Sequence, residues 1–272
     1  MEIMNSHNHF QSQSDLVAAV LADFALVPED PSQGRYLNMA EAEAIVAATI
    51  HHSAQGDSAQ EYLYLKGHRK RLAETLTMIP KAESAEESCL DIGCYGYMAF
   101  WAFHYLGYTR VEGIEMRPGE PAEIVREIEM KGKRLAFTIH NFDISQAEWP
   151  LDDTFDTLLF FETLEHVSQD PSGVMLNVTR RMTNESTLVI SVPNSVSYKT
   201  LQEFMAGAPP WTYWFFNPDL THEPRHSFEY TPIFFKILLR CAGLDELAFR
   251  TITAYVEPDT VSDYFDIGRA LS

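Results

Sequence analysis

Short hydrophobic runs alternate with helix-like patterns through the middle of the chain. The runs that have the length of buried strands lie at residues 88–93, 110–116, 135–142, 155–163 and 187–193. Between them, apolar residues recur every three or four positions, and the stretches with this helical spacing lie at 97–106, 119–131 and 171–182. Strands that alternate with helices predict an α/β fold, because parallel strands need crossover segments that return the chain to the same end of the sheet.

The two ends of the chain complete this arrangement. Near the N-terminus the apolar spacing predicts three helices, at residues 15–24, 40–51 and 58–79. Beyond the core the pattern predicts a helix and two more strands, at residues 231–242, 247–254 and 264–271. We therefore expect an N-terminal helical cap over residues 1–82 and an α/β domain over residues 83–272. The expected sheet is mostly parallel and seven-stranded, with helices on both faces.

An aromatic-rich insertion is predicted within the α/β domain at residues 195–230. Its aromatic residues are Tyr198, Phe204, Trp211, Tyr213, Trp214, Phe215, Phe216, Phe228 and Tyr230. Prolines at positions 209, 210 and 218 prevent a long regular helix there. The aromatic side chains would either wall an acceptor pocket or cover the sheet edge, and both interpretations remain open.

The first candidate binding site lies at residues 88–116. The first strand carries Asp91, Gly93 and Gly96 follow in a tight turn, and the second strand ends at Glu115. In a βαβ unit, such glycines let a ligand approach the backbone, and the second acid accepts hydrogen bonds from ribose hydroxyls. The turn lacks G-x-G-x-x-G, which favours a nucleoside without a pyrophosphate. The alternative is an α/β protein with a glycine turn and no ligand.

The turn Asp91-Ile92-Gly93-Cys94-Tyr95-Gly96-Tyr97 resembles the first motif of class I S-adenosylmethionine-dependent methyltransferases, D/E-x-G-x-G-x-G followed by an acid. Tyr95 and Tyr97 stand where the usual motif has its second and third glycines. The resemblance implies a Rossmann-like fold with S-adenosyl-L-methionine as cofactor. It also implies that the N-terminal cap closes over the cofactor and shapes the acceptor pocket. The cofactor-binding residues that it implies are Asp91, Gly93, Tyr95, Gly96, Glu115, Asp143, Ile144 and Glu162.

Asp143 and Ile144 follow the third predicted strand, where the resemblance places the adenine contacts. An aspartate at the end of a strand is also a good helix cap, so the cap remains the alternative for Asp143.

A second motif follows the fourth predicted strand. Residues 162–167, E-T-L-E-H-V, are followed by Asp170 and Pro171, and the stretch is similar to the E-x-L-E-H-V…D-P signature of small-molecule and sugar methyltransferases. Residues 226–231 match the H-x-x-E-Y-T that many sugar-type members share. A hydroxyl acceptor must lose its proton, and a base that works near pH 7 is usually a histidine or a carboxylate with a raised pKa. The catalytic candidates are therefore His166, His226 and Glu165.

A divalent cation is a second use for the same side chains. Glu162, Glu165 and His166 stand at i, i+3 and i+4, so a helical turn after the strand would bring them together, and His226 could complete the site. This E-x-x-E-H resembles the metal motif of small-RNA ribose methyltransferases. Magnesium or another divalent cation would lower the pKa of an acceptor hydroxyl. Alternatively, Glu162 contacts the cofactor alone and His166 caps a helix.

Charge narrows the choice of acceptor. The chain has 20 Lys and Arg residues against 39 Asp and Glu residues, a formal net charge of −19, which makes nucleic acid an unlikely partner. A basic cluster at residues 66–71 could contact an anionic group, although a solvated helix face is the commoner explanation. Since no apolar run is long enough to cross a bilayer and no signal-peptide core is present, we expect a cytoplasmic protein without membrane contact.

The sequence thus predicts a methyltransferase that acts on a hydroxyl of a small molecule, such as a sugar or a natural-product intermediate. One alternative is metal-dependent 2′-O-methylation of an RNA terminal ribose. The other is a non-catalytic module that retains the fold, which the altered glycine turn favours.

Overall fold

The computed structural model describes residues 34–56, 59–167, 169–207 and 226–252. The helices, in chain order, are α2 Met39–Ser53, α3 Ala59–Gly67, α4 Arg69–Leu76, α5 Tyr97–Tyr105, the 3₁₀ turn η1 Leu164–His166, α6 Pro171–Arg180, α7 Tyr198–Met205 and α8 Pro232–Cys241. The strands are β1 Ser88–Ile92, β2 Arg110–Glu115, β3 Glu123–Met130, β4 Lys133–Asn141, β5 Phe155–Phe161 and β6 Met182–Ser191.

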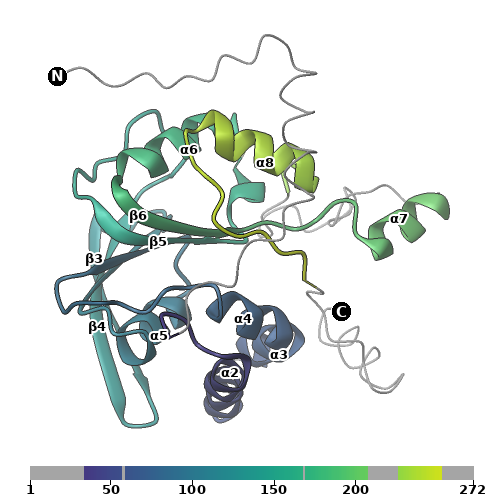
Figure 1. The fold of residues 1–272 in the computed structure, drawn as a ribbon. Coiled ribbons are helices and arrows are strands. Elements are labelled where there is room, and N and C mark those ends of the chain that lie inside the picture. The colour runs from purple at the N-terminus through teal and green to yellow at the C-terminus, as the bar shows by residue number, and fades with distance from the viewer. Residues whose placement is uncertain (1–33, 57–58, 168, 208–225, 253–272) are drawn as a thin grey trace.

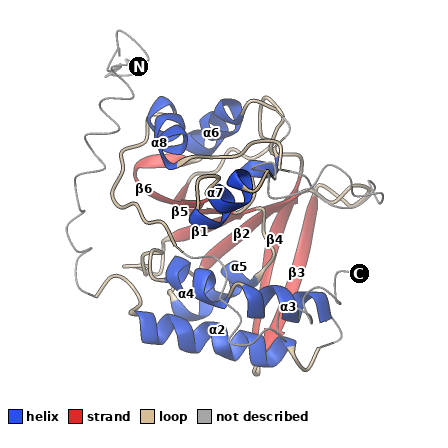
Figure 2. Ribbon diagram, turned by 90° about the vertical axis from the view of Figure 1, so that its right-hand side faces the viewer, coloured by secondary structure: helices blue, strands red, loops and turns tan. Residues whose placement is uncertain are grey.

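The described strands form one six-stranded sheet in the order β3-β4-β2-β1-β5-β6 (Figure 2). The pairs β1–β2, β1–β5, β2–β4 and β5–β6 are parallel, and β3 runs antiparallel to β4. Helices α2 to α5 lie below the sheet in Figure 1, and α6 and α8 lie above it. The predicted Rossmann-like α/β fold, mostly parallel with helices on both faces, is confirmed.

Two hydrophobic clusters hold these layers together. β1 is buried along its whole length, with Cys89 facing the cluster of α2, α4 and α5 and Leu90 facing the cluster of α6 and α8. Trp101 of α5 is fully buried and donates a hydrogen bond from its indole Nε1 to Thr49 of α2 (3.0 Å). Because of this shared core, the N-terminal helices are fixed against the α/β core.

The predicted helix at 119–131 is wrong, because β3 occupies this stretch. Val125, Glu127 and Glu129 are exposed, whereas Ile124 and Ile128 pack against the core, so the buried positions follow a period of two. The hairpin turn to β4 consists of Lys131 and Gly132, which both have positive φ (52° and 73°). A two-residue turn of this kind matches the twist of paired strands and continues β3 directly into β4.

Other predictions hold only in part. The single helix predicted at 58–79 is interrupted at His68, whose backbone (φ −100°, ψ 10°) separates α3 from α4. The strand predicted at 247–254 is absent from residues 247–252, which the structure describes without regular structure. The predicted helix at 15–24 and the seventh strand at 264–271 lie outside the described residues, as does much of the 195–230 insertion.

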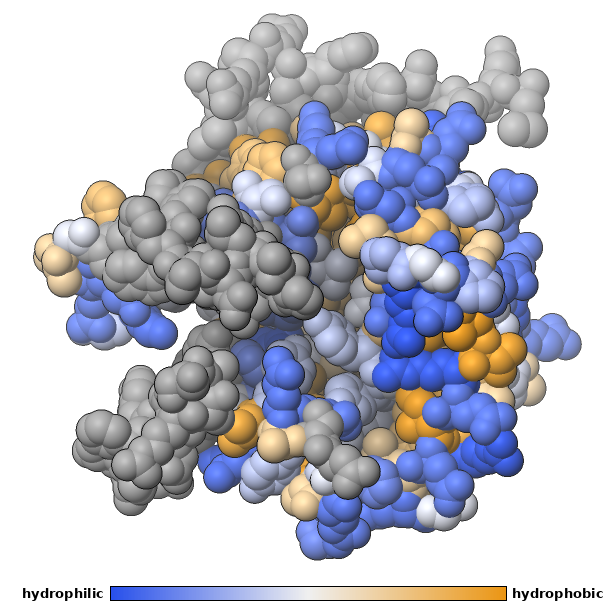
Figure 3. Space-filling view, turned by 180° about the vertical axis from the view of Figure 1, so that it is seen from behind, coloured by the Kyte–Doolittle hydropathy of each residue, from blue (hydrophilic) through white to orange (hydrophobic). Residues whose placement is uncertain are grey.

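The surface of the described residues is mostly hydrophilic in the view from behind, with smaller hydrophobic patches between the polar side chains (Figure 3). None of the helices in the described part of the chain has the length and apolar character needed to cross a membrane.

Candidate active site

The candidate residues gather at one edge of the sheet, where four neighbouring parallel strands end. Asp91 of β1 pairs in register with Gly113 of β2, so Glu115 lies just beyond the end of β1. Glu115 in turn pairs with Asn141 at the end of β4, and Asp143 follows two residues later. β5 ends at Phe161, and the motif that begins at Glu162 follows directly. In open α/β sheets, ligands bind at this carboxyl edge.

The glycine turn after β1 packs tightly against the turn after β5. Gly93 has φ +76°, and a Cβ atom there would lie 2.1 Å from Thr163 Oγ1, so no side chain fits. The amide of Gly93 donates to the Ile114 carbonyl of β2 (2.9 Å). Gly96 caps α5 with φ +94°, and Tyr95 between the two glycines remains 67% exposed. Tyr95 therefore stands over this edge of the sheet and is available to a ligand.

Asp91 is buried with an incompletely satisfied carboxyl group. Its side chain is 3% exposed, and its Oδ2 atom finds no hydrogen-bond partner within the described ranges. Burial raises the pKa of Asp91 to about 6, although hydrogen bonds from the Cys94 side chain and the Ala99 amide favour its ionised form. A buried oxygen without a partner is costly, so this atom fits a ligand that donates a hydrogen bond.

Glu115 lies between two arginines. Its Oε2 atom is 2.9 Å from Arg117 Nε and 3.7 Å from Arg126 Nη1 of β3. Asp143 is exposed, and its Oδ1 accepts a hydrogen bond from the Ser145 amide (2.8 Å), which stabilises the turn after β4. The Ile144 carbonyl accepts a hydrogen bond from the Trp149 indole (2.9 Å).

Glu162 is held in a strained conformation at the end of β5. Its φ of +47° is unusual for a residue other than glycine. Ser191 of β6 donates to its Oε1 atom (2.7 Å), and Arg71 Nη1 of α4 lies 3.7 Å from the same atom. Arg71 is 5% exposed and also donates to Tyr64 Oη of α3 (2.8 Å). The N-terminal helices thus bring a buried cation to the edge of the sheet.

The predicted helical turn after β5 is present as η1, and it brings Glu165 and His166 beside His226. Glu165 Oε1 lies 3.8 Å from His166 Nε2 and 4.0 Å from His226 Nε2, and the two imidazole rings are 4.9 Å apart. The amide of Ser227 donates to the Glu165 carbonyl (2.6 Å), which fixes the distant segment against η1. His226 Nδ1 also lies 3.1 Å from Glu229 Oε1.

Glu165 is the most deeply buried acid of this cluster. Its side chain is 2% exposed, and its Oε2 atom lacks a hydrogen-bond partner among the residues that the structure describes. Burial raises the pKa of Glu165 to about 8, and the neighbouring Glu162 charge adds to the effect. Near neutral pH this carboxyl group is therefore close to the point at which it takes up or releases a proton.

Three of these side chains could hold a cation. Donor atoms of Glu165, His166 and His226 all lie within 4.8 Å of one another, and Glu162, the fourth predicted ligand, is not part of this group. Two imidazole nitrogens and one carboxylate oxygen suit a divalent transition metal better than magnesium, which prefers oxygen ligands.

A family comparison decides the class. The sequence matches a family model described as a methyltransferase domain over residues 64–247, which is more than half of the chain. The chain belongs to this methyltransferase family. The predicted membership of the class I S-adenosylmethionine-dependent methyltransferases is thereby confirmed, whereas the sugar O-methyltransferase type is a finer assignment. A comparison with curated proteins finds no match.

Solved methyltransferase structures are similar to this methyltransferase over part of its length. An S-adenosylmethionine-dependent methyltransferase from Archaeoglobus fulgidus is 21% identical, with a TM-score of 0.39, and the match covers 58% of this chain and 60% of that chain. An S-adenosylmethionine-dependent methyltransferase from Mesorhizobium loti is 19% identical, with a TM-score of 0.35, and the match covers 46% of this chain and 53% of that chain. CalS10, an amino pentose methyltransferase from Micromonospora echinaspora, is 15% identical, with a TM-score of 0.30, and the match covers 60% of this chain and 59% of that chain. The match thus spans less than two thirds of each of these chains.

Sequence reasoning about this methyltransferase missed two arginines at the site. Arg71 belongs to the basic cluster at 66–71, where the solvated face was the favoured interpretation, and its neighbours Arg69 and Lys70 are indeed exposed. Arg71 alone of these three is buried, four residues before the buried Thr75, and its distance in angle from Leu72 and Leu76 means that the apolar spacing of the helix gave no signal for it. Arg126 was missed because its strand was predicted as a helix.

Proposed function

We propose that this methyltransferase transfers a methyl group from S-adenosylmethionine to a hydroxyl oxygen of a small molecule such as a sugar or a natural-product intermediate. The observation that carries the proposal is Glu165, a buried carboxyl group with an oxygen that lacks a hydrogen-bond partner in the described structure, next to His166 and His226. It lies on the turn after β5, two strands from Glu115 across β1.

The residues at the sheet edge fit the cofactor. Asp91 Oδ2 is a buried oxygen to which the described residues donate no hydrogen bond, and Arg117 and Arg126 both approach Glu115 through its Oε2 atom, which leaves Oε1 for a ligand. The hydroxyls and ammonium of S-adenosylmethionine are donors. When bound, the cofactor supplies a methyl group on a sulfonium. Asp91, Gly93, Tyr95, Gly96, Glu115, Asp143, Ile144 and Glu162 are the residues that would hold it.

The protein's own residues remove the proton of the acceptor hydroxyl. A hydroxyl oxygen is a weak nucleophile until its proton leaves, and Glu165, with a pKa of about 8, is matched to that task near neutral pH. Each of the two histidines has its Nε2 atom within 4.0 Å of Glu165 Oε1. The dry setting that raises the pKa of Glu165 also excludes water from the acceptor.

The N-terminal helices form part of the proposed acceptor pocket. Tyr64 of α3 stacks on Tyr95 of the glycine turn, with ring centroids 6.1 Å apart, and both rings are partly exposed. Arg71 reaches Glu162 from the same side. We infer that residues 1–82 act as the cap of the methyltransferase domain at 83–272. A net charge of −19 favours a small acceptor over nucleic acid.

The test is transfer of isotope-labelled methyl groups to a panel of sugars, phenols and amines. We expect transfer to a hydroxyl, and we expect Glu165→Gln to lower the rate by roughly a hundredfold or more, the scale of general-base catalysis. Glu86→Gln, on the exposed stretch before β1, makes the same change in charge and should leave the rate unchanged. Transfer to amines alone, or full activity of Glu165→Gln, would contradict the proposal.

A second candidate function is metal-dependent 2′-O-methylation of an RNA terminal ribose. The observation that favours it is the group formed by Glu165, His166 and His226, in which a divalent cation would lower the pKa of the acceptor hydroxyl. Calorimetric titration with Mn²⁺ tests it: the wild type should bind one equivalent, His226→Ala should not, and His51→Ala, an exposed histidine on α2, should bind as the wild type does. Full transfer activity after chelation would eliminate this candidate.

The family match supports an enzyme over the non-catalytic module that the altered glycine turn suggested. Calorimetry with S-adenosylhomocysteine tests the proposed cofactor site: the wild type should bind, and Asp91→Ala and Glu115→Ala should weaken that binding.

A further inference from the structure

Strand β3, which replaces the helix predicted from the sequence, brings the side chain of Arg126 to the proposed cofactor site. In Figure 2, β3 lies at the edge of the sheet next to β4, with β2 beyond β4. Arg126 pairs in register with Phe137 of β4 and lies between Ile124 and Ile128, whose side chains pack against the core on the α5 side. The Arg126 side chain therefore spans β4 to reach the end of β2.

Two contacts place the Arg126 guanidinium inside the candidate site. Its Nη1 atom is 3.7 Å from Glu115 Oε2. A Cβ atom added to Gly96 would lie 3.2 Å from Arg126 Cζ and 2.7 Å from Ile128 Cδ1, so β3 packs directly against the glycine turn. A side chain at position 96 would collide with side chains of β3, which is one reason why this position requires glycine.

The Arg126 guanidinium lies beside two carboxyl groups of the site. Asp91 and Glu115 are neighbouring acids at the edge of the sheet, and the Glu115 charge raises the pKa of Asp91 while the Arg126 charge lowers it. Arg117 holds Glu115 from its own loop at 2.9 Å, and Arg126 approaches the same oxygen from β3. Two cations around one oxygen restrict the rotation of the carboxylate, and they leave its other oxygen for a ligand.

We propose that Arg126 is a positioning residue of the cofactor site, which holds the Glu115 carboxylate beside the glycine turn in the orientation that receives the ribose hydroxyls of S-adenosylmethionine. This inference rests on the proposed function, because it assigns the ribose to Glu115. It concerns the adenosine part of the cofactor and not its amino-acid part.

Calorimetry with two ligands tests the proposal. S-adenosylhomocysteine carries both the adenosine and the amino-acid parts, whereas 5′-methylthioadenosine lacks the amino-acid part. Arg126→Met should lower the binding affinity for both ligands by the same factor, roughly tenfold, which is the scale of one charge-assisted contact. Arg126→Lys should recover part of the loss. Arg134→Met is the matched control, since Arg134 lies in the same hairpin, pairs with Glu127 and is 63% exposed, and it should bind both ligands as the wild type does.

A double-mutant cycle separates positioning from a general loss of structure. In a Glu115→Gln background, Arg126→Met should have little further effect on the affinity for 5′-methylthioadenosine. Unchanged affinity of Arg126→Met, or a loss confined to S-adenosylhomocysteine, would overturn the inference, because the second result would assign Arg126 to the amino-acid carboxylate. A wild-type protein that binds neither ligand would overturn the proposed function itself, and the inference with it.

Discussion

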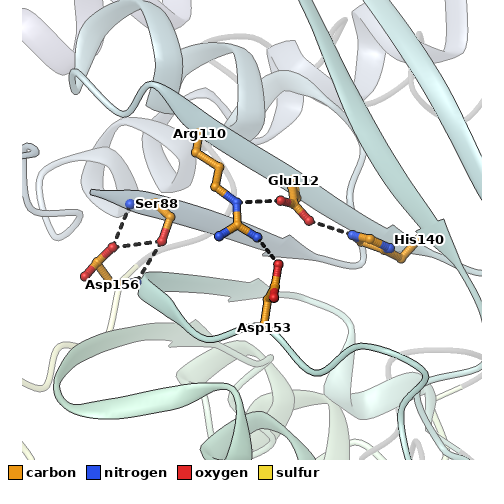
Figure 4. Close-up of polar contacts among 6 residues, drawn as sticks. All are labelled: Ser88, Arg110, Glu112, His140, Asp153 and Asp156. Atoms are coloured by element: carbon orange, nitrogen blue, oxygen red, sulfur yellow. Dashed lines mark hydrogen bonds and ion pairs between the residues drawn. The ribbon is translucent and has the colours of Figure 1, made fainter. Parts of the chain in front are cut away.

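The sheet carries two groups of charged side chains that are built in opposite ways. In the first group, the acids and bases satisfy one another (Figure 4). Arg110 of β2 donates from Nε to Glu112 (2.7 Å) and pairs with Asp153, and His140 Nε2 of β4 lies 2.6 Å from Glu112. Asp156 accepts hydrogen bonds from the amide and the hydroxyl of Ser88 (2.7 and 2.8 Å). Here hydrogen bonding, first of all to His140, lowers the pKa of Glu112.

The second group, at the carboxyl edge, is left incomplete. One oxygen each of Asp91 and Glu165 is buried without a hydrogen-bond partner in the described part of the chain. Burial raises the pKa of Asp91 and of Glu165, which is the opposite of the effect on Glu112. A fold tolerates such groups where a ligand or a reaction uses them, so the contrast supports the proposal that the edge is the functional site and that the Glu112 group is structural.

Glu165→Gln should produce the largest stability effect that separates the two groups. The carboxyl of Glu165 has a pKa of about 8 in the folded protein and an ordinary pKa of 4.5 in the unfolded chain, so between these values the folded protein holds a proton that the unfolded chain releases. Stability that this proton provides is present below about pH 4.5 and is lost as the pH rises through 8. Glutamine resembles the protonated form, so the variant should be more stable than the wild type at high pH, by on the order of 4 kcal/mol.

Chemical denaturation of both proteins between pH 5 and 9 measures this difference. The free energy of unfolding of the variant, minus that of the wild type, should grow with pH and level off above pH 8. Glu86→Gln should give a difference that stays near zero. A constant difference for Glu165→Gln would mean that Glu165 is not a strained acid, and the contrast between the two groups would lose its main support.

Asp91→Asn should act in the same direction but less strongly. The folded pKa of about 6 lies above the ordinary value of 3.8 for an aspartate in the unfolded chain, so the stability from the bound proton is lost as the pH rises through 6. The gain of the variant above pH 6 should be roughly 3 kcal/mol at most. Calorimetry should at the same time show weaker binding of S-adenosylhomocysteine. A variant that gains stability without losing affinity would remove Asp91 from the cofactor site.

Much of the carboxyl edge could be predicted from sequence, because its residues follow directly after hydrophobic strands. Asp91, Glu115 and Glu162 lie at the ends of predicted runs, and parallel strands bring such ends together. The i, i+3, i+4 spacing also anticipated the turn that brings Glu165 to His166. The chemistry that each residue performs stays a prediction, since the pattern fixes its place and not its ligand.

The remaining features depend on contacts that no local pattern contains. The exchange of a helix for β3 is decided by the Lys131–Gly132 turn, which has two residues with positive φ, and by pairing with β4. Arg126 reaches Glu115 only because of that exchange. Likewise, His226 meets Glu165 through the hydrogen bond of the Ser227 amide, across some sixty residues of sequence that show no relation between them.

Glu112→Gln should give a smaller effect than Glu165→Gln or Asp91→Asn, and with the opposite sign. The pKa of Glu112 is lowered by its contacts with His140 and Arg110, so its ionised form stabilises the fold. That contribution is present above 4.5, the ordinary pKa of a glutamate in the unfolded chain, and is lost as the pH falls through the folded pKa. At pH 7 the variant should lose no more than about 1 kcal/mol, because the group is partly solvated. Glu127→Gln, in an exposed ion pair with Arg134, should lose less. If Glu112→Gln were more stable than the wild type, Glu112 would be a strained acid like Glu165, and the contrast between the two groups would not hold.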